Sequence, residues 1–164
     1  MMNIAGSLAL AGLLAAGCGS GRECAQDGKG PAARTAAATA PDFARADGKT
    51  TLALFTGSDW CIWCKRLEGE VLSTPEFKKA LEDKYALETL DFPSDESKID
   101  KATAARNAAL MKKYGVRGFP TIVVFDAKGR RLCTLGYKRG GARAWLEYAE
   151  AEIKRAASAA GKAD

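Results

Sequence analysis

The chain has 164 residues, of which 47% are apolar, so it is long enough for one folded domain with a short additional segment. Its net charge of +5 comes from basic residues that are scattered rather than clustered with aromatic residues, which argues against nucleic-acid binding. The chain contains no histidine, and this excludes Cys–His and Ser–His catalysis and removes the commonest metal ligand.

The first 17 residues have the pattern of a targeting segment. Residues 4–17 are uncharged, rich in alanine and leucine, and too short to span a bilayer comfortably as a helix. Small residues then precede Cys18, as at a secretory cleavage site, and the run from Leu14 to Cys18 resembles the box at which bacterial lipoproteins are lipidated. We therefore predict a signal peptide at 1–17 and a lipid anchor on Cys18. An ordinary secretory signal, an uncleaved anchor and a cytosolic protein are the alternatives.

Residues 18–41 are small, polar and rich in proline and glycine. Such a composition cannot bury enough apolar surface to offset the entropy of ordering, so a flexible tether is expected after the lipidated cysteine. Cys24 lies in this segment, either as an incidental thiol or as a resolving or intermolecular one. Among lipoproteins, a glycine such as Gly19 after the cysteine fits sorting to the outer membrane of a two-membrane bacterium.

A globular pattern begins at Asp42, and we expect one domain over 42–157. Thr50–Thr56 has the composition of a buried strand. Cys61–Leu72 is predicted to be a helix, on which the apolar spacing places Cys64 toward the core and Cys61 at the exposed N-terminal end. Thr74 and Pro75 then form the cap and first position of a new helix.

The second half of the domain predicts further elements in a regular order. A candidate strand at Tyr85–Phe92 and a polar loop precede a helix ended by Gly115. Two strands follow, at Thr121–Phe125 and Arg131–Tyr137, joined by a tight turn. A last helix packs through Trp145, Ala149 and Ile153, and residues 158–164 are expected to fray. The order predicts an α/β fold with a mixed central sheet flanked by helices.

Cys61 and Cys64 are separated by two residues at the predicted start of a helix. Unpaired N–H groups and the positive end of the helix dipole favour a thiolate at Cys61, and the thiolate is the species that attacks a disulfide. Cys64, one turn further in, can then attack the resulting mixed disulfide and release the substrate. The spacing therefore predicts a redox-active dithiol.

Zinc binding is the alternative explanation of this spacing, but tetrahedral zinc needs four ligands. Cys24 and Cys133 would have to supply the other two, and Cys133 is instead expected to be a small buried core residue. We therefore predict no metal and no cofactor. Trp60 either packs over the helix start or forms a wall of a substrate groove, whereas Trp63 must lie near the surface if the pair is to be reached.

Two segments resemble the active-site face of the thioredoxin superfamily, namely Phe55–Lys65 and Lys112–Thr121. They are similar to exported bacterial thioredoxin-like proteins, including the C-terminal domain of thiol:disulfide interchange reductases. The resemblance covers about residues 42–155 and implies a thioredoxin fold. It implies that Cys61 is the nucleophile and Cys64 the resolving thiol.

The same resemblance implies that Pro120 forms a cis peptide bond beside the cysteines and leaves the backbone of Phe119 free to pair with an extended substrate. The expected contact residues of the groove are Trp60, Ile62, Trp63, Phe119 and Pro120. The expected activity is a protein-disulfide reductase outside the cytoplasm, lipid-anchored on the periplasmic side of the outer membrane or elsewhere in the cell envelope. Its expected partners are disulfide-bonded proteins and a membrane electron donor.

One departure from the family concerns the buried aspartate that thioredoxin carries six residues before its first cysteine, because Phe55 occupies that position here. Asp59 is expected in solvent, and Glu88 or Asp91 on the next strand are candidate substitutes. A second departure is the insertion-like stretch Pro93–Arg106, which is a candidate partner surface.

Two other functions are compatible with the sequence. A thioredoxin-fold binding module could hold a soft metal such as Cu(I) between the two thiolates, although no methionine-rich or histidine site accompanies them. A non-catalytic adaptor could keep the cysteines as a structural disulfide. Metal analysis of the reduced protein and a redox titration distinguish these functions from a reductase.

Overall fold

The computed structural model describes residues 42–160. They form a four-stranded sheet in the order β2-β1-β3-β4, built from β1 (Thr50–Thr56), β2 (Tyr85–Asp91), β3 (Thr121–Phe125) and β4 (Arg131–Leu135). β1 pairs with β2 in parallel and with β3 antiparallel, and β3 pairs antiparallel with β4. The predicted mixed sheet and the predicted order of elements are confirmed.

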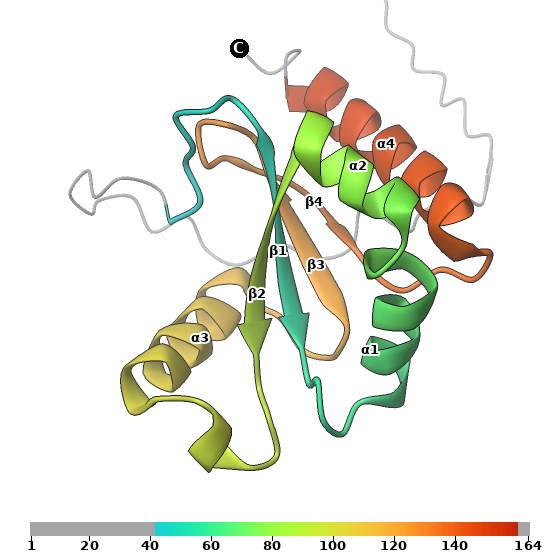
Figure 1. Cartoon of the computed structure of the whole chain (residues 1–164). Helices are drawn as coiled ribbons and strands as arrows, with labels where there is room; N and C mark the ends of the chain where they lie inside the picture. Colours follow the sequence, from blue (N-terminus) through green and yellow to red (C-terminus); the bar gives the residue numbers. More distant parts are fainter. Residues whose placement is uncertain (1–41, 161–164) are drawn as a thin grey trace, which may run out of the picture.

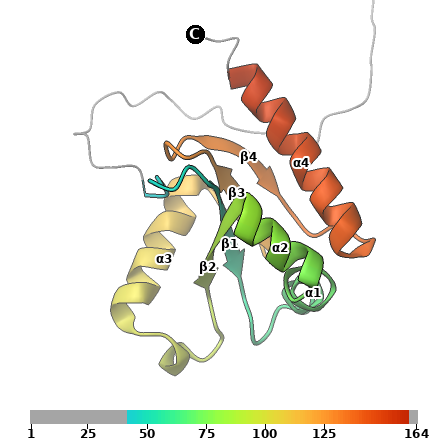
Figure 2. The ribbon, with the colours of Figure 1, turned by 45° about the horizontal axis from the view of Figure 1, so that its top comes forward.

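Helices cover both faces of this sheet (Figure 1). α1 (Ile62–Leu67) continues into a short π-helix, η1 (Glu68–Leu72), and these two elements lie on the same face as α2 (Pro75–Asp83) and α4 (Gly141–Ala160). α3 (Lys101–Tyr114) covers the opposite face, as the rotated view shows (Figure 2). A single 3₁₀ turn, η2 (Glu96–Lys98), precedes α3 within the described residues.

The apolar run of β1 explains the two-sided core. Leu52 and Leu54 join the cluster beneath α1, α2 and α4, whereas Ala53 and Phe55 join the cluster beneath α3. Successive side chains of a strand point to opposite faces, so a central strand covered on both faces needs a continuous apolar sequence. The same alternation holds in β3, where Ile122 and Val124 face one cluster and Val123 and Phe125 the other.

The helix boundaries follow the predicted capping signals, with one correction at the C-terminus. Thr74 caps α2 by accepting the N–H of Phe77, with Pro75 in the first turn, and Gly115 ends α3 in the left-handed conformation at φ 67°. α4 extends through Ala160, so residues 158–160 are helical rather than frayed. Trp145 is fully buried on this helix, packs against Phe77 and donates to the carbonyl of Gly136.

Candidate functional site

Sheet pairing brings the two predicted halves of the site together. β1 ends at Thr56, directly before the cysteine motif, and its Phe55 pairs with Thr121 at the start of β3. Because the two strands are antiparallel, the end of one lies beside the beginning of the other, so Pro120 lies next to the segment that carries the cysteines. The Phe119–Pro120 bond is cis, as predicted.

Cys61 is the N-cap residue of α1, and its sulfur accepts a hydrogen bond from the backbone N–H of Cys64 at 3.2 Å. Both cysteines are free thiols, with exposed fractions of 6% for Cys61 and 4% for Cys64. The expectation that Cys61 lies exposed at the helix end is therefore wrong. The capping bond explains the difference, because it turns the side chain back over the first helical turn instead of outward.

The Cys64 thiol holds its proton more tightly than a free cysteine. Burial is the main cause of its raised pKa, and the neighbouring Cys61 sulfur adds to it. The hydroxyl of Thr56 and the backbone N–H of Gly57 oppose the shift, because both can donate a hydrogen bond to the thiolate. The net effect of these surroundings is that the Cys64 thiol stays protonated to a higher pH than a free cysteine does.

Exposed apolar side chains surround the pair. Trp60, Ile62 and Trp63 are 52%, 66% and 42% exposed, which is unusual for large apolar residues so close together. The Nε1 of Trp60 donates to the carbonyl of Phe92 at 2.8 Å, and its ring makes an edge contact with that of Phe119, with the ring centroids 5.7 Å apart. About half of the Trp60 side chain stays exposed.

Trp63 has a different set of neighbours from Trp60. Its ring is 5.6 Å from that of Tyr137, and the guanidinium of Arg66 lies 5.1 Å from the ring centre. The hydroxyl of Tyr137 donates in turn to Glu70. These contacts link Trp63 to the segment after β4 and, through Tyr137, link that segment to η1.

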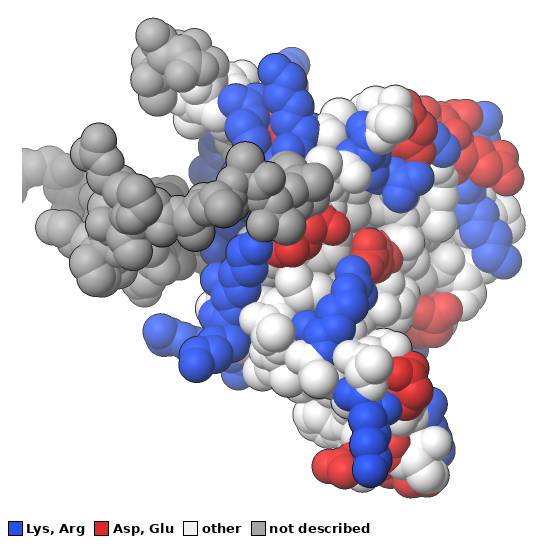
Figure 3. All heavy atoms as spheres, turned by 90° about the vertical axis from the view of Figure 1, so that its left-hand side faces the viewer, with Lys and Arg blue, Asp and Glu red and all other residues white. Residues whose placement is uncertain are grey.

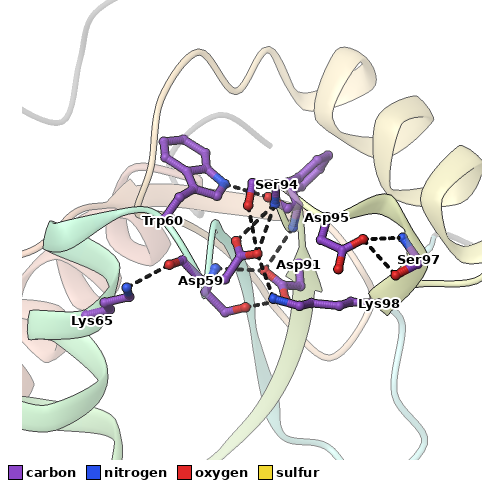
Figure 4. Close-up of polar contacts among 10 residues, drawn as sticks. Asp59, Trp60, Lys65, Asp91, Ser94, Asp95, Ser97 and Lys98 are labelled. Atoms are coloured by element: carbon purple, nitrogen blue, oxygen red, sulfur yellow. Dashed lines mark hydrogen bonds and ion pairs between the residues drawn. The ribbon is translucent and has the colours of Figure 1, made fainter.

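The turn before the cysteines is attached to the loop after β2 (Figure 4). Asp59 accepts the backbone N–H of Ser94 at 3.0 and 3.2 Å, the Ser94 hydroxyl at 2.9 Å and the Lys98 ammonium at 3.1 Å. Its side chain is only 18% exposed, so the expectation of a solvent position is wrong. These bonds, led by that of the Ser94 backbone, hold the pKa of Asp59 well below its usual range.

Further bonds attach the same turn to β2. Ser58 donates its N–H and its hydroxyl to the carboxylate of Asp91 at 2.9 and 2.6 Å, and Lys65 donates to the carbonyl of Asp59 at 2.7 Å. Ser94 and Lys98 are functional candidates that the sequence did not identify. The only available signal was the insertion-like character of Pro93–Arg106, which contains both.

Neither proposed substitute for the missing aspartate is directed to the cysteines. Phe55, at the aspartate position, is fully buried in the cluster beneath α3. Glu88 pairs with Arg106, and Asp91 is bound by Ser58. The main influences on Cys64 are burial, Cys61, Thr56 and Gly57, and no carboxylate is among them.

The remaining three cysteines lie away from this pair or outside the described residues. Cys133 is a buried core residue with 5% exposure, as predicted. Cys18 and Cys24, with the signal peptide and the tether, lie outside the described residues. Within residues 42–160 no three His, Cys, Asp or Glu side chains are grouped so that they could hold a metal ion. The same range contains no helix with the length and apolar character needed to span a membrane.

On the face that Figure 3 shows, the described residues carry both basic and acidic side chains, with uncharged surface between them.

Comparisons with known proteins agree with the site. A family model described as a thioredoxin-like domain matches residues 38–150. The chain is 32% identical over 117 residues to the disulfide bond reductase DsbH of Chlamydia pneumoniae, a match that covers 71% of this chain and 70% of that protein. A solved structure of a DsbH oxidoreductase superposes with a TM-score of 0.63 at 27% identity, over 77% of this chain and 95% of the other.

A second relative is the thiol:disulfide interchange protein DsbD of Cronobacter sakazakii, 36% identical over 90 residues. That match covers 55% of this chain but only 14% of DsbD, so the chain corresponds to one small part of the larger protein. The predicted thioredoxin fold and the predicted similarity to these oxidoreductases are confirmed. With its mixed sheet, its paired cysteines at a helix start and its match over residues 38–150, the chain belongs to the family of thioredoxin-like domains.

Proposed function

We propose that this protein is a thiol–disulfide oxidoreductase that reduces disulfide bonds in other proteins. The observation that carries the proposal is the hydrogen bond from the Cys64 N–H to the Cys61 sulfur, because an N–H directed at a sulfur is the donor that an attacking thiolate needs. The raised pKa of Cys64 supports the division of roles, because Cys64 keeps its proton while Cys61 attacks. Reduction rather than oxidation is favoured by the similarity to a disulfide bond reductase.

The reaction proceeds in two balanced exchanges. The Cys61 thiolate attacks one sulfur of the substrate disulfide, a mixed disulfide forms, and the other substrate sulfur leaves as a thiolate that takes up a proton. Cys64 then loses its proton and attacks the Cys61 sulfur, which forms the Cys61–Cys64 disulfide and releases the second substrate thiol. Two electrons pass from the dithiol to the substrate, and an external dithiol donor must return them before the next cycle.

Trp60, Ile62, Trp63, Phe119 and Pro120 form the substrate groove in this proposal. Their exposed apolar surface supports it, because an accessible apolar patch next to a reactive group is the usual form of a docking site for unfolded or extended polypeptides. The ring contact between Trp60 and Phe119 joins the cysteine side of the groove to the proline side. An extended substrate strand is expected to pair with the Phe119 backbone.

We further propose that the protein acts outside the cytoplasm, anchored by a lipid on Cys18 and supplied with electrons by a membrane reductase. The apolar segment at residues 4–17 and the residues before Cys18 support export. A folded domain beginning near residue 42, joined by the segment 18–41, would then act at a distance from the membrane surface. Metabolic labelling with palmitate, compared between the natural protein and Cys18→Ala, tests the anchor.

The decisive experiment is reduction of insulin disulfides by the chain and its cysteine variants, with dithiothreitol as donor. Cys61→Ser should abolish the reaction. Cys64→Ser should form a mixed disulfide with the substrate that is detectable by mass and slow to resolve. Cys133→Ala, at a buried core position, should retain activity. Full activity of Cys61→Ser would overturn the proposal, and a reduced pair that binds Cu(I) without reducing insulin would replace it with the metal-binding alternative.

A further inference from the structure

A cavity of about 340 Å³ lies between the loop after β2 and the first turns of α3. Its apolar lining comes from Phe92, Pro93, Ile99 and Ala104, all of them half-buried. This volume falls at the small end of the range for ligand-binding pockets, roughly 300–1,000 Å³. The cavity is therefore large enough for one or two side chains of a partner, and its walls are the kind that apolar groups bind.

The charged residues at this cavity do not favour an ion or a small charged ligand. Asp91 lines it, but its carboxylate is already bound by Ser58 and by the N–H of Phe92. Glu96 and Lys101 also line it, are exposed and carry opposite charges. The cavity therefore favours an apolar occupant, because the carboxylate of Asp91 already has its hydrogen-bond donors and the charges of Glu96 and Lys101 cancel.

Phe92 joins this cavity to the redox groove. Its ring lies 5.1 Å from that of Phe119, and its carbonyl accepts a hydrogen bond from the Trp60 indole N–H. Phe92 is also one of the residues that line the cavity. Phe92 is therefore shared by the cavity wall and by the contacts of the proposed groove. A polypeptide lying along Phe119 would pass next to the cavity, so the occupant that we infer is a side chain of that same polypeptide.

The cavity is also preformed. The loop that forms its rim is fixed by the bonds of Ser94 and Lys98 to Asp59, and the helix behind it is capped by Asp100, which accepts the N–H of Thr103 at 2.9 Å. A rigid pocket loses little conformational entropy when it is filled, so even one apolar side chain can contribute usefully to affinity.

We propose that this cavity is a specificity subsite that binds an apolar side chain, such as leucine, of the polypeptide whose disulfide is reduced at Cys61. The proposal rests on the proposed function and adds a sequence preference to it. It predicts that substrates with an apolar residue at one fixed position relative to the disulfide react faster than substrates with glycine or aspartate there.

The test uses the full chain, a series of disulfide-bonded peptides that carry Leu, Gly or Asp at successive positions beside the cysteine, and the small disulfide hydroxyethyl disulfide. Ala104→Leu places a side chain into the cavity, and Ala108→Leu, on an exposed position of the same helix, is the matched control. The natural chain should prefer Leu over Gly at one position by roughly tenfold or more, the size expected for burial of one apolar side chain.

Ala104→Leu should lose that preference, Ala108→Leu should keep it, and all three should reduce hydroxyethyl disulfide equally. Ile99→Ala enlarges the cavity and should shift the preference from Leu toward Phe, which tests the site even if Ala104→Leu folds poorly. The subsite would be overturned if the natural chain reduced the Leu and Gly peptides at the same rate at every position. It would also be overturned if the Leu-to-Gly rate ratio stayed unchanged in both Ala104→Leu and Ile99→Ala. A natural chain that reduces neither the peptides nor hydroxyethyl disulfide would overturn the proposed function itself, which is a different result.

Discussion

The indole of Trp60 lies directly against Gly57, so closely that a Cβ atom at position 57 would come within 2.5 Å of its Cε2 atom. The glycine leaves room for the ring, and the bond from Nε1 to the Phe92 carbonyl holds it there. The exposed tryptophan beside Cys61 thus has a defined position that depends on an absent side chain three residues earlier in the chain.

Gly57→Ala should therefore displace Trp60 and break its bond to Phe92. Overpacking of this kind costs about 1–3 kcal/mol of unfolding free energy. The kcat/KM for insulin should fall more than that for hydroxyethyl disulfide, because only the larger substrate needs the groove wall. The indole N–H resonance of Trp60 reports the displacement directly. Gly69→Ala is the control, since nothing lies within 4 Å of a Cβ there, and an unmoved resonance in Gly57→Ala would contradict the prediction.

The release step should depend on pH in a way set by Cys64. Burial raises the pKa of this thiol, so at neutral pH less of it is thiolate than in a free cysteine, and only the thiolate attacks. A mixed disulfide on Cys61 should resolve about tenfold faster per pH unit, with no plateau until the pH passes the raised pKa. Stopped-flow release of thionitrobenzoate measures this step, and a plateau below about pH 8 would be inconsistent with a raised pKa.

Thr56→Val should move the same pH profile toward higher pH. The Thr56 hydroxyl lowers the pKa of Cys64, and valine keeps the shape of the side chain but cannot donate a hydrogen bond to the thiolate. Release at a fixed neutral pH should therefore slow. Thr51→Val, a buried threonine at the other end of β1 whose hydroxyl donates to Phe43, serves as the matched control and should leave the profile in place. An identical profile in Thr56→Val would show that the hydroxyl has no role.

Asp59→Asn should loosen the attachment of the turn to the loop after β2. The carboxylate has a pKa well below its usual range, so it stabilises the fold fully above about pH 4, the ordinary value for aspartate. The stabilisation is lost as the pH falls further and the carboxylate takes up a proton. The difference in urea midpoint between Asp59→Asn and the natural chain should thus be constant near neutrality and shrink in strong acid.

Glu82→Gln, which removes an exposed carboxylate with no comparable set of bonds, provides the comparison for that experiment. Its midpoint should match the natural chain at neutral pH. If the urea midpoint of Asp59→Asn also matched that of the natural chain at neutral pH, the bonds from Ser94 and Lys98 to Asp59 would contribute nothing to stability. Other contacts would then have to hold the loop after β2 in place.

Asn107→Ala should destabilise the domain from within α3. Asn107 is 2% exposed, and its Nδ2 donates to the carbonyl of Asp91 at 3.0 Å, at the end of β2. Removing the donor takes this hydrogen bond away from a part-buried carbonyl, which costs up to about 1–3 kcal/mol. Denaturant unfolding measures the loss. Equal stability would indicate that the cost of Asn107 Oδ1, buried without a partner among the described residues, already cancels the benefit of the bond.

The elements of the fold were predictable because their signals are local. The continuous apolar run of β1, the Thr74–Pro75 start of α2 and the Gly115 end of α3 each depend on neighbours within a few residues. The cysteine spacing and the proline before β3 were equally visible. The end of α4 was placed too early, because the alanine-rich sequence after residue 157 favours a helix as much as a frayed terminus.

The surroundings of the cysteines were not predictable in the same way. Asp59 was expected in solvent because it follows a turn, but its partner Ser94 is 35 positions away and meets it only when β1 and β2 pair. Cys61 was expected to be exposed because it begins a helix, but its own capping bond draws the sulfur inward. Hydrogen bonds between distant segments carry no periodic signal in the sequence.

The sequence alone thus determined where the dithiol lies, since two cysteines separated by two residues at the start of a helix are a local pattern. Only the tertiary structure decided what surrounds that dithiol. Its surroundings include the hydrogen bonds that hold Asp59, the ring contacts of Trp60 and Trp63, and the cavity beside α3. The physical reason is that local propensity acts over one or two turns of chain, whereas these surroundings are assembled from segments far apart in the chain that the sheet brings together.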